Sequence, residues 1–446
     1  MQAGFHVSAR LSSVFTSQIL ESYLKSALTR NTLWMISGHG LRLVIQAVYF
    51  TVIARSLGPN NYGAFVGVVA LVGIASPFGM LGSGNLLVKN VSRNKDVFAE
   101  YWGQALAITA ISTTILFTAI VLLSHFLLPG SIPVSLVILV AGADLFGFSL
   151  ITLAAFAFQA FEQLKWTATV NVLISIGRLI GAVTLVSFHR HPTAQQWGYV
   201  YCMMTAAVVA VSLILVTVKL GLPHLNLQRS TRELREGFYF SVSVSAQTVY
   251  NDIDKMMLAR LGTLDATGIY GAAYRLVDVS FVPISSVMAA AYPSFFRKGA
   301  DGLSAALQFA KRLLKRAIVY VAVLTVGILV GAGLIPYVLG AEYERSVEAL
   351  RWLAFIPLLR AGHYFFSAAL TGAGYQDIRT GIQAAVAIFN VLINFWLIPQ
   401  YSWRGAAWAS LASDGLLAIG IGLAAFILKR QSRKVIVDFP VTASSD

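Results

Sequence analysis

The sequence predicts an all-α integral membrane protein with about twelve transmembrane helices, arranged as two pseudo-symmetric lobes of six helices around a central cavity. Three observations predict this fold class. The 446 residues are 57% hydrophobic and only 12% charged, whereas soluble domains carry about 25% charged residues. Long apolar segments recur along the whole chain. Motifs of the first half return, in the same order, in the second half.

Each predicted span is an apolar segment of about 20 residues or more, because a helix of that length crosses the roughly 30 Å hydrocarbon core of a bilayer. The spans cover residues 32–56, 62–86, 100–128, 132–158, 166–188, 195–218, 236–260, 267–293, 312–338, 347–372, 379–398 and 403–428. The predicted organisation is a tail over 1–31, a first lobe over 32–218, a linker over 219–235, a second lobe over 236–428 and a tail over 429–446.

The charged residues of the connections predict the orientation, because Lys and Arg concentrate on the cytoplasmic side of membrane proteins. With a cytoplasmic N-terminus, the cytoplasmic connections hold 22 Lys and Arg residues and the opposite side holds 6. We therefore expect both termini in the cytoplasm and an even number of spans. The same bias accounts for the net charge of +14 without a nucleic-acid partner.

Similar motifs at equivalent positions of the two halves predict the two-lobe arrangement. Parallel repeats of this kind are related by an axis along the membrane normal, and they hold substrate at their interface. The paired motifs are Ala54-Arg55-Ser56-Leu57-Gly58 with Ala259-Arg260-Leu261-Gly262, Tyr62-Gly63-Ala64 with Tyr270-Gly271-Ala272, and Asn171-Val172-Leu173-Ile174 with Asn390-Val391-Leu392-Ile393.

Several kinds of chemistry have no signature in this sequence. Cys202 is the single cysteine, which excludes a disulfide within the chain and any cysteine-based metal site. The chain contains no Walker A or GxGxxG phosphate loop and no HExxH, GxSxG or CxxC motif. We expect no metal and no cofactor, apart from a coupling ion. Residues 1–30 lack the features of a signal peptide, which leaves a short helix on the membrane surface or a disordered tail.

One family resemblance starts from the first of the paired motifs. Arg55-Ser56-Leu57-Gly58-Pro59-Asn60-Asn61-Tyr62-Gly63 resembles the R-x-L-G-P-x-x-Y-G stretch of Wzx-type polysaccharide-biosynthesis (O-antigen) flippases. These belong to the multidrug/oligosaccharidyl-lipid/polysaccharide exporter (MOP) superfamily. The other similar stretches are 252–255 followed by 268–275, 369–374 with Arg379, and Asn390 and Asn394 with Ile398-Pro399 and Gly405-Ala406-Ala407.

The resemblance implies a MATE-like fold and a flippase of the bacterial inner membrane. Such a protein moves an undecaprenyl-pyrophosphate-linked oligosaccharide from the cytoplasmic to the periplasmic leaflet by alternating access, with an ion gradient rather than ATP as its energy source. The expected partners are therefore the lipid-linked oligosaccharide and membrane lipids. Other polysaccharide-assembly membrane proteins are further candidates.

A cavity that carries a pyrophosphate headgroup needs cations, and arginine suits phosphate because its planar guanidinium binds two oxygens at once. Charges inside a bilayer are costly and persist mainly where they face a bundle interior or a wet cavity. The candidate substrate contacts are the five cations within the predicted spans, Arg42, Arg178, Lys255, Arg275 and Arg360. The candidate polar and aromatic neighbours are Gln46, Tyr49, Gln247, Tyr250, Asn251 and Tyr274.

Helical spacing groups some of these residues. Arg42, Gln46 and Tyr49 are four and three residues apart, so they share one face of the first span. The first and seventh spans are equivalent in the repeat, and we expect their polar faces to meet across the cavity. Candidate rings for stacking on sugars are Tyr49, Tyr250, Tyr270 and Tyr274.

Each cation has an alternative role in an ion pair within its lobe. Arg275 with Asp278, or Lys255 with Asp252 or Asp254, would neutralise charge and brace the bundle. Ion coupling needs a carboxylate whose affinity changes between states, and a buried carboxyl group takes up a proton more readily. The candidates are Asp144, Asp252, Asp254, Asp278 and Asp414, with Asp254 and Asp278 first. A hydrogen-bonded structural role is the alternative for Asp144 and Asp414, and the ion, H⁺ or Na⁺, stays open.

Two other classes of protein fit parts of the sequence. A drug or cation antiporter of the same fold would favour acidic groups in the cavity. Here the five cations within spans are matched by five aspartates, which favours an anionic substrate modestly. A membrane enzyme that acts on lipid-linked sugars would be expected to expose a large periplasmic loop, and all predicted loops on that side are short.

Overall fold

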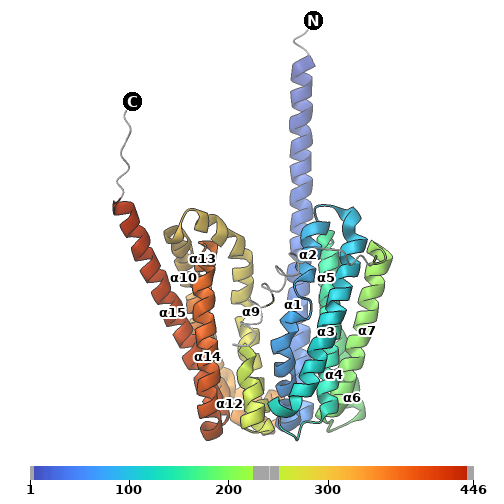
Figure 1. Ribbon diagram of the computed structural model, residues 1–446, viewed down its shortest axis with the longest axis vertical. Coiled ribbons are helices and arrows are strands. Elements are labelled where there is room, and N and C mark those ends of the chain that lie inside the picture. Colours follow the sequence, from blue (N-terminus) through green and yellow to red (C-terminus); the bar gives the residue numbers. More distant parts are fainter. Residues whose placement is uncertain (1–4, 225–240, 242–250, 439–446) are drawn as a thin grey trace.

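The computed structural model describes residues 5–224, 241 and 251–438, and these residues are almost entirely helical, without a strand among them. Figure 1 shows the helices in two groups, one formed by the first half of the chain and one by the second. We call them the N-lobe, up to Leu220, and the C-lobe, from Asn251 onward. The predicted linker over 219–235 lies largely outside the described residues.

The N-lobe begins with one very long helix. Helix α1 covers Phe5–Ala75 but contains a non-helical residue at Gly58, with φ of 68°. A positive φ suits glycine, and the following Pro59 lacks a backbone N–H donor, so the helix changes direction here. The first predicted span and residues 62–75 of the second therefore lie within α1. The other N-lobe helices are α2 (Ser83–Val91), α3 (Phe98–Leu127), α4 (Val134–Ala141), α5 (Ser149–Ala160), α6 (Leu164–Phe188) and α7 (Ala194–Leu220).

The C-lobe starts in the described residues with a helical stretch over 251–261, the end of the predicted seventh span. It continues with α9 (Leu264–Ala300), α10 (Leu303–Gly331), α11 (Ile335–Leu339), α12 (Arg345–Leu353), α13 (Ile356–Gly372), α14 (Gln376–Tyr401) and α15 (Trp403–Asp438). Thr263 directly precedes α9, and its side chain caps the helix by accepting a hydrogen bond from the Ala266 N–H at 3.1 Å.

Nine helices of the described chain are long and apolar enough to cross a membrane, and α9, bent by 45°, would make a tenth. One of the nine, Ser37–Phe78, contains most of two predicted spans, one on either side of Gly58. Every predicted span except the seventh falls mainly on described helices, so the structure is consistent with twelve. The chain is thus a multi-pass membrane protein.

The two ends of the described chain lie at the same end of the bundle (Figure 1). An even number of spans requires this. The N-terminal segment, for which the sequence left a surface helix or a disordered tail open, is instead helical from Phe5 and continuous with the first predicted span. Figure 1 shows this helix projecting beyond the other helices of both lobes.

Three hydrophobic cores describe how the lobes pack. One lies within the N-lobe and includes Trp102 and Phe158. A second lies within the C-lobe and includes Phe295 and Phe365. The third joins the lobes, and its members include Trp197 of the N-lobe together with the C-lobe residues Tyr270 and Tyr343. Each lobe thus has its own core, and a shared core holds them together.

The shared core is sealed by contacts around the break in α1. A Cβ atom on Gly63 would lie 1.7 Å from the Leu264 carbonyl oxygen, so only glycine fits where α1 meets α9. The Tyr343 hydroxyl donates a hydrogen bond to the Ala54 carbonyl at 2.9 Å. Burial raises the pKa of this hydroxyl, which therefore stays a donor. These contacts close the end of the bundle that lies away from the chain termini (Figure 1). We call this end of the bundle the closed end.

Candidate functional site: a charged cavity between the lobes

A cavity of about 250 Å³ lies between the lobes and is lined by charged side chains of both. The N-lobe contributes Arg178 from α6 and Tyr49 from α1. The C-lobe contributes Lys255, together with Arg275 of α9. Three of the five predicted cations therefore converge on one cavity, as expected for the interface of two repeats. The acidic side chains in its wall are Asp252 and Asp278.

Arg275 is the cation of this cavity that the protein leaves available. It is partly buried, and within the described chain it has no ion pair or hydrogen bond from its side chain. The alternative pair with Asp278 is not formed, because Asp278 points to Arg360 of α13, with 3.2 Å between Nη1 and Oδ1. A guanidinium without an internal partner, at the wall of a cavity, is suited to bind an anionic group.

Arg178 is held by two neighbours in the N-lobe. Its Nη2 lies 2.9 Å from Oδ1 of Asp144, and its guanidinium lies 4.1 Å from the centre of the Tyr201 ring. The Tyr201 hydroxyl donates to the same carboxylate oxygen at 2.7 Å. Asp144 lies in a π-helical turn, Gly142–Phe148, between α4 and α5. Such turns are rare and are frequently found at functional sites.

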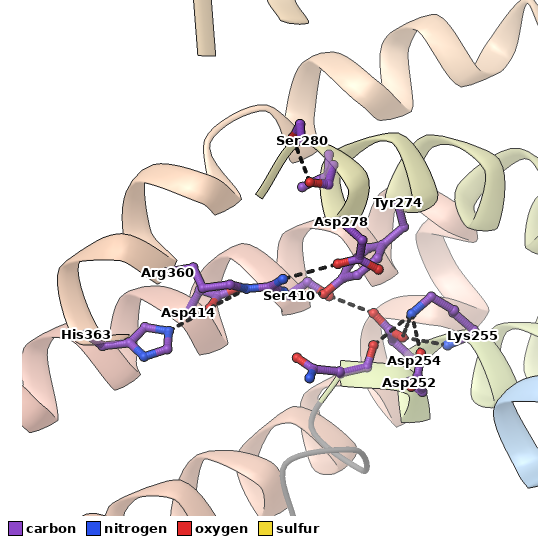
Figure 2. A network of polar contacts seen from close by, with 12 residues as sticks. Asp252, Asp254, Lys255, Tyr274, Asp278, Ser280, Arg360, His363, Ser410 and Asp414 are labelled. Carbon is purple, nitrogen blue, oxygen red and sulfur yellow. Dashed lines mark hydrogen bonds and ion pairs between the residues drawn. The ribbon is translucent and has the colours of Figure 1, made fainter. Parts of the chain in front are cut away.

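Lys255 forms the ion pair with Asp252 that the sequence left as an alternative. Its Nζ lies 2.7 Å from Asp252, 4.0 Å from Asp254 and 3.9 Å from the centre of the Tyr274 ring. It also donates to the Asn251 carbonyl at 2.8 Å. Figure 2 shows this cluster. The charge of Lys255 is thus largely neutralised by its own helix, which makes it a weaker candidate for substrate binding than Arg275.

Asp254 is almost completely buried and fully hydrogen-bonded. Its carboxylate accepts hydrogen bonds from the Tyr270 hydroxyl, from the Ser410 hydroxyl at 2.8 Å and from the Lys255 N–H at 2.7 Å. The Ser410 bond ties the seventh predicted span to α15 (Figure 2). Donors from three different parts of the C-lobe meet at this carboxylate, so a change in its protonation would alter all of these contacts.

Arg360 is the centre of a second charged cluster in the C-lobe. Besides Asp278, it lies 4.0 Å from Asp414, and it donates to the Tyr274 hydroxyl at 2.8 Å. The same oxygen of Asp414, Oδ1, lies 3.1 Å from Nε2 of His363. Figure 2 shows His363, Asp414, Arg360 and Asp278 following one another across the lobe.

This chain of charges connects the central cavity to another one. A cavity of about 370 Å³ inside the C-lobe is lined by Arg360 and His363, together with Arg379 and Gln383 of α14. Asp278 faces the cavity between the lobes, whereas its partner Arg360 faces the cavity inside the lobe. The ion pair between them therefore forms part of the wall that separates the two cavities.

The remaining predicted residues divide into three groups. Arg42 is partly buried in α1 and does not line the central cavity. It lies close enough to Arg178 and Arg275 for electrostatic repulsion from both. Gln46 is also partly buried in α1, and Asn251 lines the C-lobe cavity. Gln247 and Tyr250 lie outside the described residues.

The stacking expectation for Tyr270 and Tyr274 is wrong for this conformation. Their residues are 0% and 2% exposed, and their hydroxyl groups bond to Asp254 and Arg360. Hydrogen bonds to the charged clusters hold these two rings in the protein interior. Tyr49 keeps its place at the central cavity, where its ring lies 5.7 Å from that of Trp197.

Several residues of the site were missed by the sequence analysis. Arg379 was noted only as part of a family-like stretch, yet it lines the C-lobe cavity and donates to Thr371 at 2.9 Å. Tyr201 and Ser410 were not considered, although they bond to Asp144 and Asp254. A polar residue within an apolar span was the available signal for both. Spacing within one helix could not pair them with carboxylates of another.

Comparison with known sequences supports a transporter. The family model described as "Polysaccharide biosynthesis protein" matches residues 28–298. A protein of Escherichia coli (strain K12) to which O-antigen transport is ascribed is 21% identical over 401 residues, which covers 88% of this chain and 95% of the relative. The resemblance noticed in the sequence is thereby confirmed.

Comparison with solved structures concerns the fold. The inward-facing conformation of a multidrug resistance MATE family transporter of the MOP superfamily has a TM-score of 0.74 at 15% identity, covering 88% of this chain and 96% of that one. The lipid II flippase MurJ in its inward closed conformation has a TM-score of 0.71 at 10% identity, covering 88% and 87%. The predicted MATE-like architecture is confirmed.

Proposed function

Because the chain belongs to the polysaccharide biosynthesis protein family, whose model covers more than half of it, we propose that it is a flippase for an undecaprenyl-pyrophosphate-linked oligosaccharide. The proposed direction is from the cytoplasmic to the periplasmic leaflet of a bacterial inner membrane. The O-antigen transport ascribed to the Escherichia coli relative supports the substrate class.

The observation that carries this proposal is the convergence of Arg178, Lys255 and Arg275 from both lobes on one cavity. A pyrophosphate in hydrocarbon needs cations to replace its hydration, and guanidinium groups provide charge and paired hydrogen bonds. Arg275 provides the contact without first losing an internal partner. Arg178 adds a further guanidinium across the cavity, held in place by Asp144.

The packing of the lobes supports alternating access. In this conformation the lobes are joined at the closed end, while their individual cores lie apart. With both termini cytoplasmic, the closed end is periplasmic, and the headgroup enters from the cytoplasmic side. Rocking of one lobe against the other would then break the closed end and release the headgroup to the periplasm.

We assign ion coupling to the Asp278–Arg360–Asp414 cluster. Asp278 faces the substrate cavity and is bonded to a cation shared with another carboxylate. A proton or Na⁺ bound at Asp278 or Asp414 would weaken the attraction of that carboxylate for Arg360 and strengthen the pairing of Arg360 with the other. Because Asp278 lines the substrate cavity, ion binding would in this way change the charge at the cavity wall. The protein is on this proposal a secondary transporter that needs no nucleotide.

A drug or cation antiporter remains the second candidate, because the MATE transporter shares the fold. An organic cation would need a carboxylate that is free to bind it. Asp252 and Asp278 are the acidic groups in the central cavity, and both are already paired with cations, whereas Arg275 is not. The available charge is therefore positive, which favours an anionic substrate.

The test is a leaflet assay in cells that lack this protein. Lipid-linked oligosaccharide is scored for accessibility on each face of the inner membrane after wild type, Arg42→Ala or Arg275→Ala is added back. We expect wild type to restore periplasmic precursor and Arg275→Ala to fail at equal membrane levels. Normal translocation without any added protein, in a strain free of related flippases, would reject the flippase and put the antiporter first.

A further inference from the structure

A groove on the outside of the C-lobe has no role in the proposed transport path. It has a volume of about 510 Å³, which lies within the range of sites that hold small ligands. Its walls come from α10 and α15, and Phe366 of α13 contributes to its floor. None of its lining residues lines the cavity between the lobes.

The rim of this groove is positively charged. Lys311 of α10 and both Lys429 and Arg430 of α15 line it, and no acidic residue does. None of these three cations forms an ion pair with an acidic side chain in the described part of the chain. Three unneutralised cations at one groove form a site that is complementary to a negatively charged group.

The floor of the groove is apolar and has room for a hydrocarbon chain. It contains Leu307, Phe366 and Phe426, and the space above Gly422 is open, since a Cβ atom there would meet nothing within 4 Å. Phe426 is 65% exposed, and its neighbour Leu423 is also exposed. Such exposure of large apolar side chains is expected where a helix faces the bilayer rather than water.

The position of the groove places the cations at a membrane surface. The first turns of α10 and the last turns of α15 lie at the end of the bundle that holds both termini (Figure 1). Lys429 and Arg430 fall at the end of the candidate span Trp403–Gln431. The charged rim therefore lies at the level of the headgroups, and the apolar floor lies deeper.

We propose that this groove, between the start of α10 and the end of α15, binds an anionic glycerophospholipid of the surrounding membrane. The phosphate contacts Lys311, Lys429 and Arg430, and an acyl chain lies over Gly422 between Phe366 and Phe426. Basic pockets between helices on the cytoplasmic side are suited to anionic headgroups. The separation from the central cavity points to a resident membrane lipid rather than to transported substrate, so the proposal does not depend on the proposed function.

Native mass spectrometry of the full-length protein tests this proposal. Detergent-purified protein is titrated with dioleoyl phosphatidylglycerol, with dioleoyl phosphatidylethanolamine and with undecaprenyl phosphate. We expect phosphatidylglycerol to bind most tightly. Each cation near a headgroup contributes about fivefold in affinity, so Lys311→Gln should weaken phosphatidylglycerol binding about fivefold, and the triple variant Lys311→Gln/Lys429→Gln/Arg430→Gln about 100-fold.

Two matched controls locate the site. Arg312→Gln changes the next residue of α10, which does not line the groove, and should leave binding unchanged. Gly422→Phe fills the floor and should reduce binding, whereas Gly327→Phe, at an equally open and exposed position of α10, should not. Unaltered thermal melting without added lipid shows that each variant is folded.

Three results would overturn the proposal. Equal binding of the anionic and zwitterionic lipids would remove the role of the cations. Equal losses for Lys311→Gln and Arg312→Gln would show a diffuse surface charge instead of a site. Preference for undecaprenyl phosphate over phosphatidylglycerol would assign the groove to the lipid carrier of the substrate.

Discussion

Gly268 of α9 lies against Pro59 of α1 so closely that a Cβ atom on Gly268 would be 1.9 Å from the Pro59 carbonyl oxygen. The contact brings the two lobes together at the closed end. It also explains why the turn after the first predicted span meets the start of α9 without any intervening side chain. A methyl group at this position cannot be accommodated unless the backbones of the two lobes move apart.

The first prediction follows from that contact. Gly268→Ala should destabilise the closed end by about 1–3 kcal/mol, the usual cost of overpacking. In a Cys202→Ser background, a cysteine replacing the buried Ala266 of α9 should become more accessible to a membrane-impermeant maleimide added to whole cells. Gly327→Ala, at a glycine with open space around it, is the control. Unchanged labelling in Gly268→Ala would show that the lobes do not depend on this contact.

Arg275 should matter for binding and not for folding. It has no internal partner in the described structure, so Arg275→Ala should leave thermal stability within about 0.5 kcal/mol of wild type. Loss of a hydrogen bond to a charged group costs about 1.5–3 kcal/mol, so affinity for undecaprenyl pyrophosphate should fall roughly 10- to 150-fold. Binding is measured by titration of the purified protein. Rescue by Arg275→Lys should be only partial, because lysine cannot bind two oxygens in parallel.

Arg178, unlike Arg275, should matter for folding. Its side chain and that of Asp144 are each largely buried, so removing one partner leaves the other charge without compensation. We expect Arg178→Gln to lower the free energy of unfolding by about 1–3 kcal/mol. Arg178→Gln combined with Asp144→Asn should cost less than the sum of the single changes, as a double-mutant cycle would show. Additive losses would mean that the pair contributes no coupling. The exposed pair Lys298–Asp301, a single contact at 3.6 Å, serves as control, with no measurable loss expected.

Asp278 should link transport to the ion gradient. Asp278→Asn leaves Arg360 without its anionic partner at the cavity wall while preserving size. In proteoliposomes, wild type should respond to an imposed proton or Na⁺ gradient, whereas Asp278→Asn should translocate lipid-linked oligosaccharide at a rate independent of either gradient. Asp301→Asn removes an exposed carboxylate that pairs with Lys298 and should behave as wild type. A gradient response retained in Asp278→Asn would move the coupling to another carboxylate.

The fold and part of the site follow from the sequence because each depends on local patterns. Apolar length placed the spans, and the paired motifs around Gly58 and Gly262 predicted two lobes. Arg178, Lys255 and Arg275 were recognised because charge within an apolar span is costly and needs a cavity or a partner. Which of these roles each cation has depends on contacts between helices. The spacing in α9 suggested a pair between Arg275 and Asp278, but Asp278 pairs with Arg360, which is distant in sequence.

The roles of Tyr270 and Tyr274 also depend on contacts between helices that the sequence does not reveal. Their positions in an apolar helix suit sugar stacking as well as they suit hydrogen bonds to a buried charge. The choice is made by Asp254 and Arg360, which lie on other helices. Gly58 was predictable as a turn from Pro59, Asn60 and Asn61, and the helix is interrupted at this residue. The close contact of this turn with α9 was not predictable, since it depends on packing between the lobes.

Every ion pair described above joins two side chains of the same lobe. At the closed end the lobes meet through apolar side chains, glycine backbone and hydrogen bonds to carbonyl groups. The Tyr343 hydroxyl donates one such bond to Ala54, and the Arg55 guanidinium donates another to Tyr337. Opening this end would hydrate apolar surface without separating an ion pair of the described residues, and such hydration raises the heat capacity. Apolar association weakens on cooling, whereas salt screens only charges. On the proposed alternating access, the equilibrium between the two states should therefore shift with temperature far more than with ionic strength, and cold should favour the state in which the closed end is open.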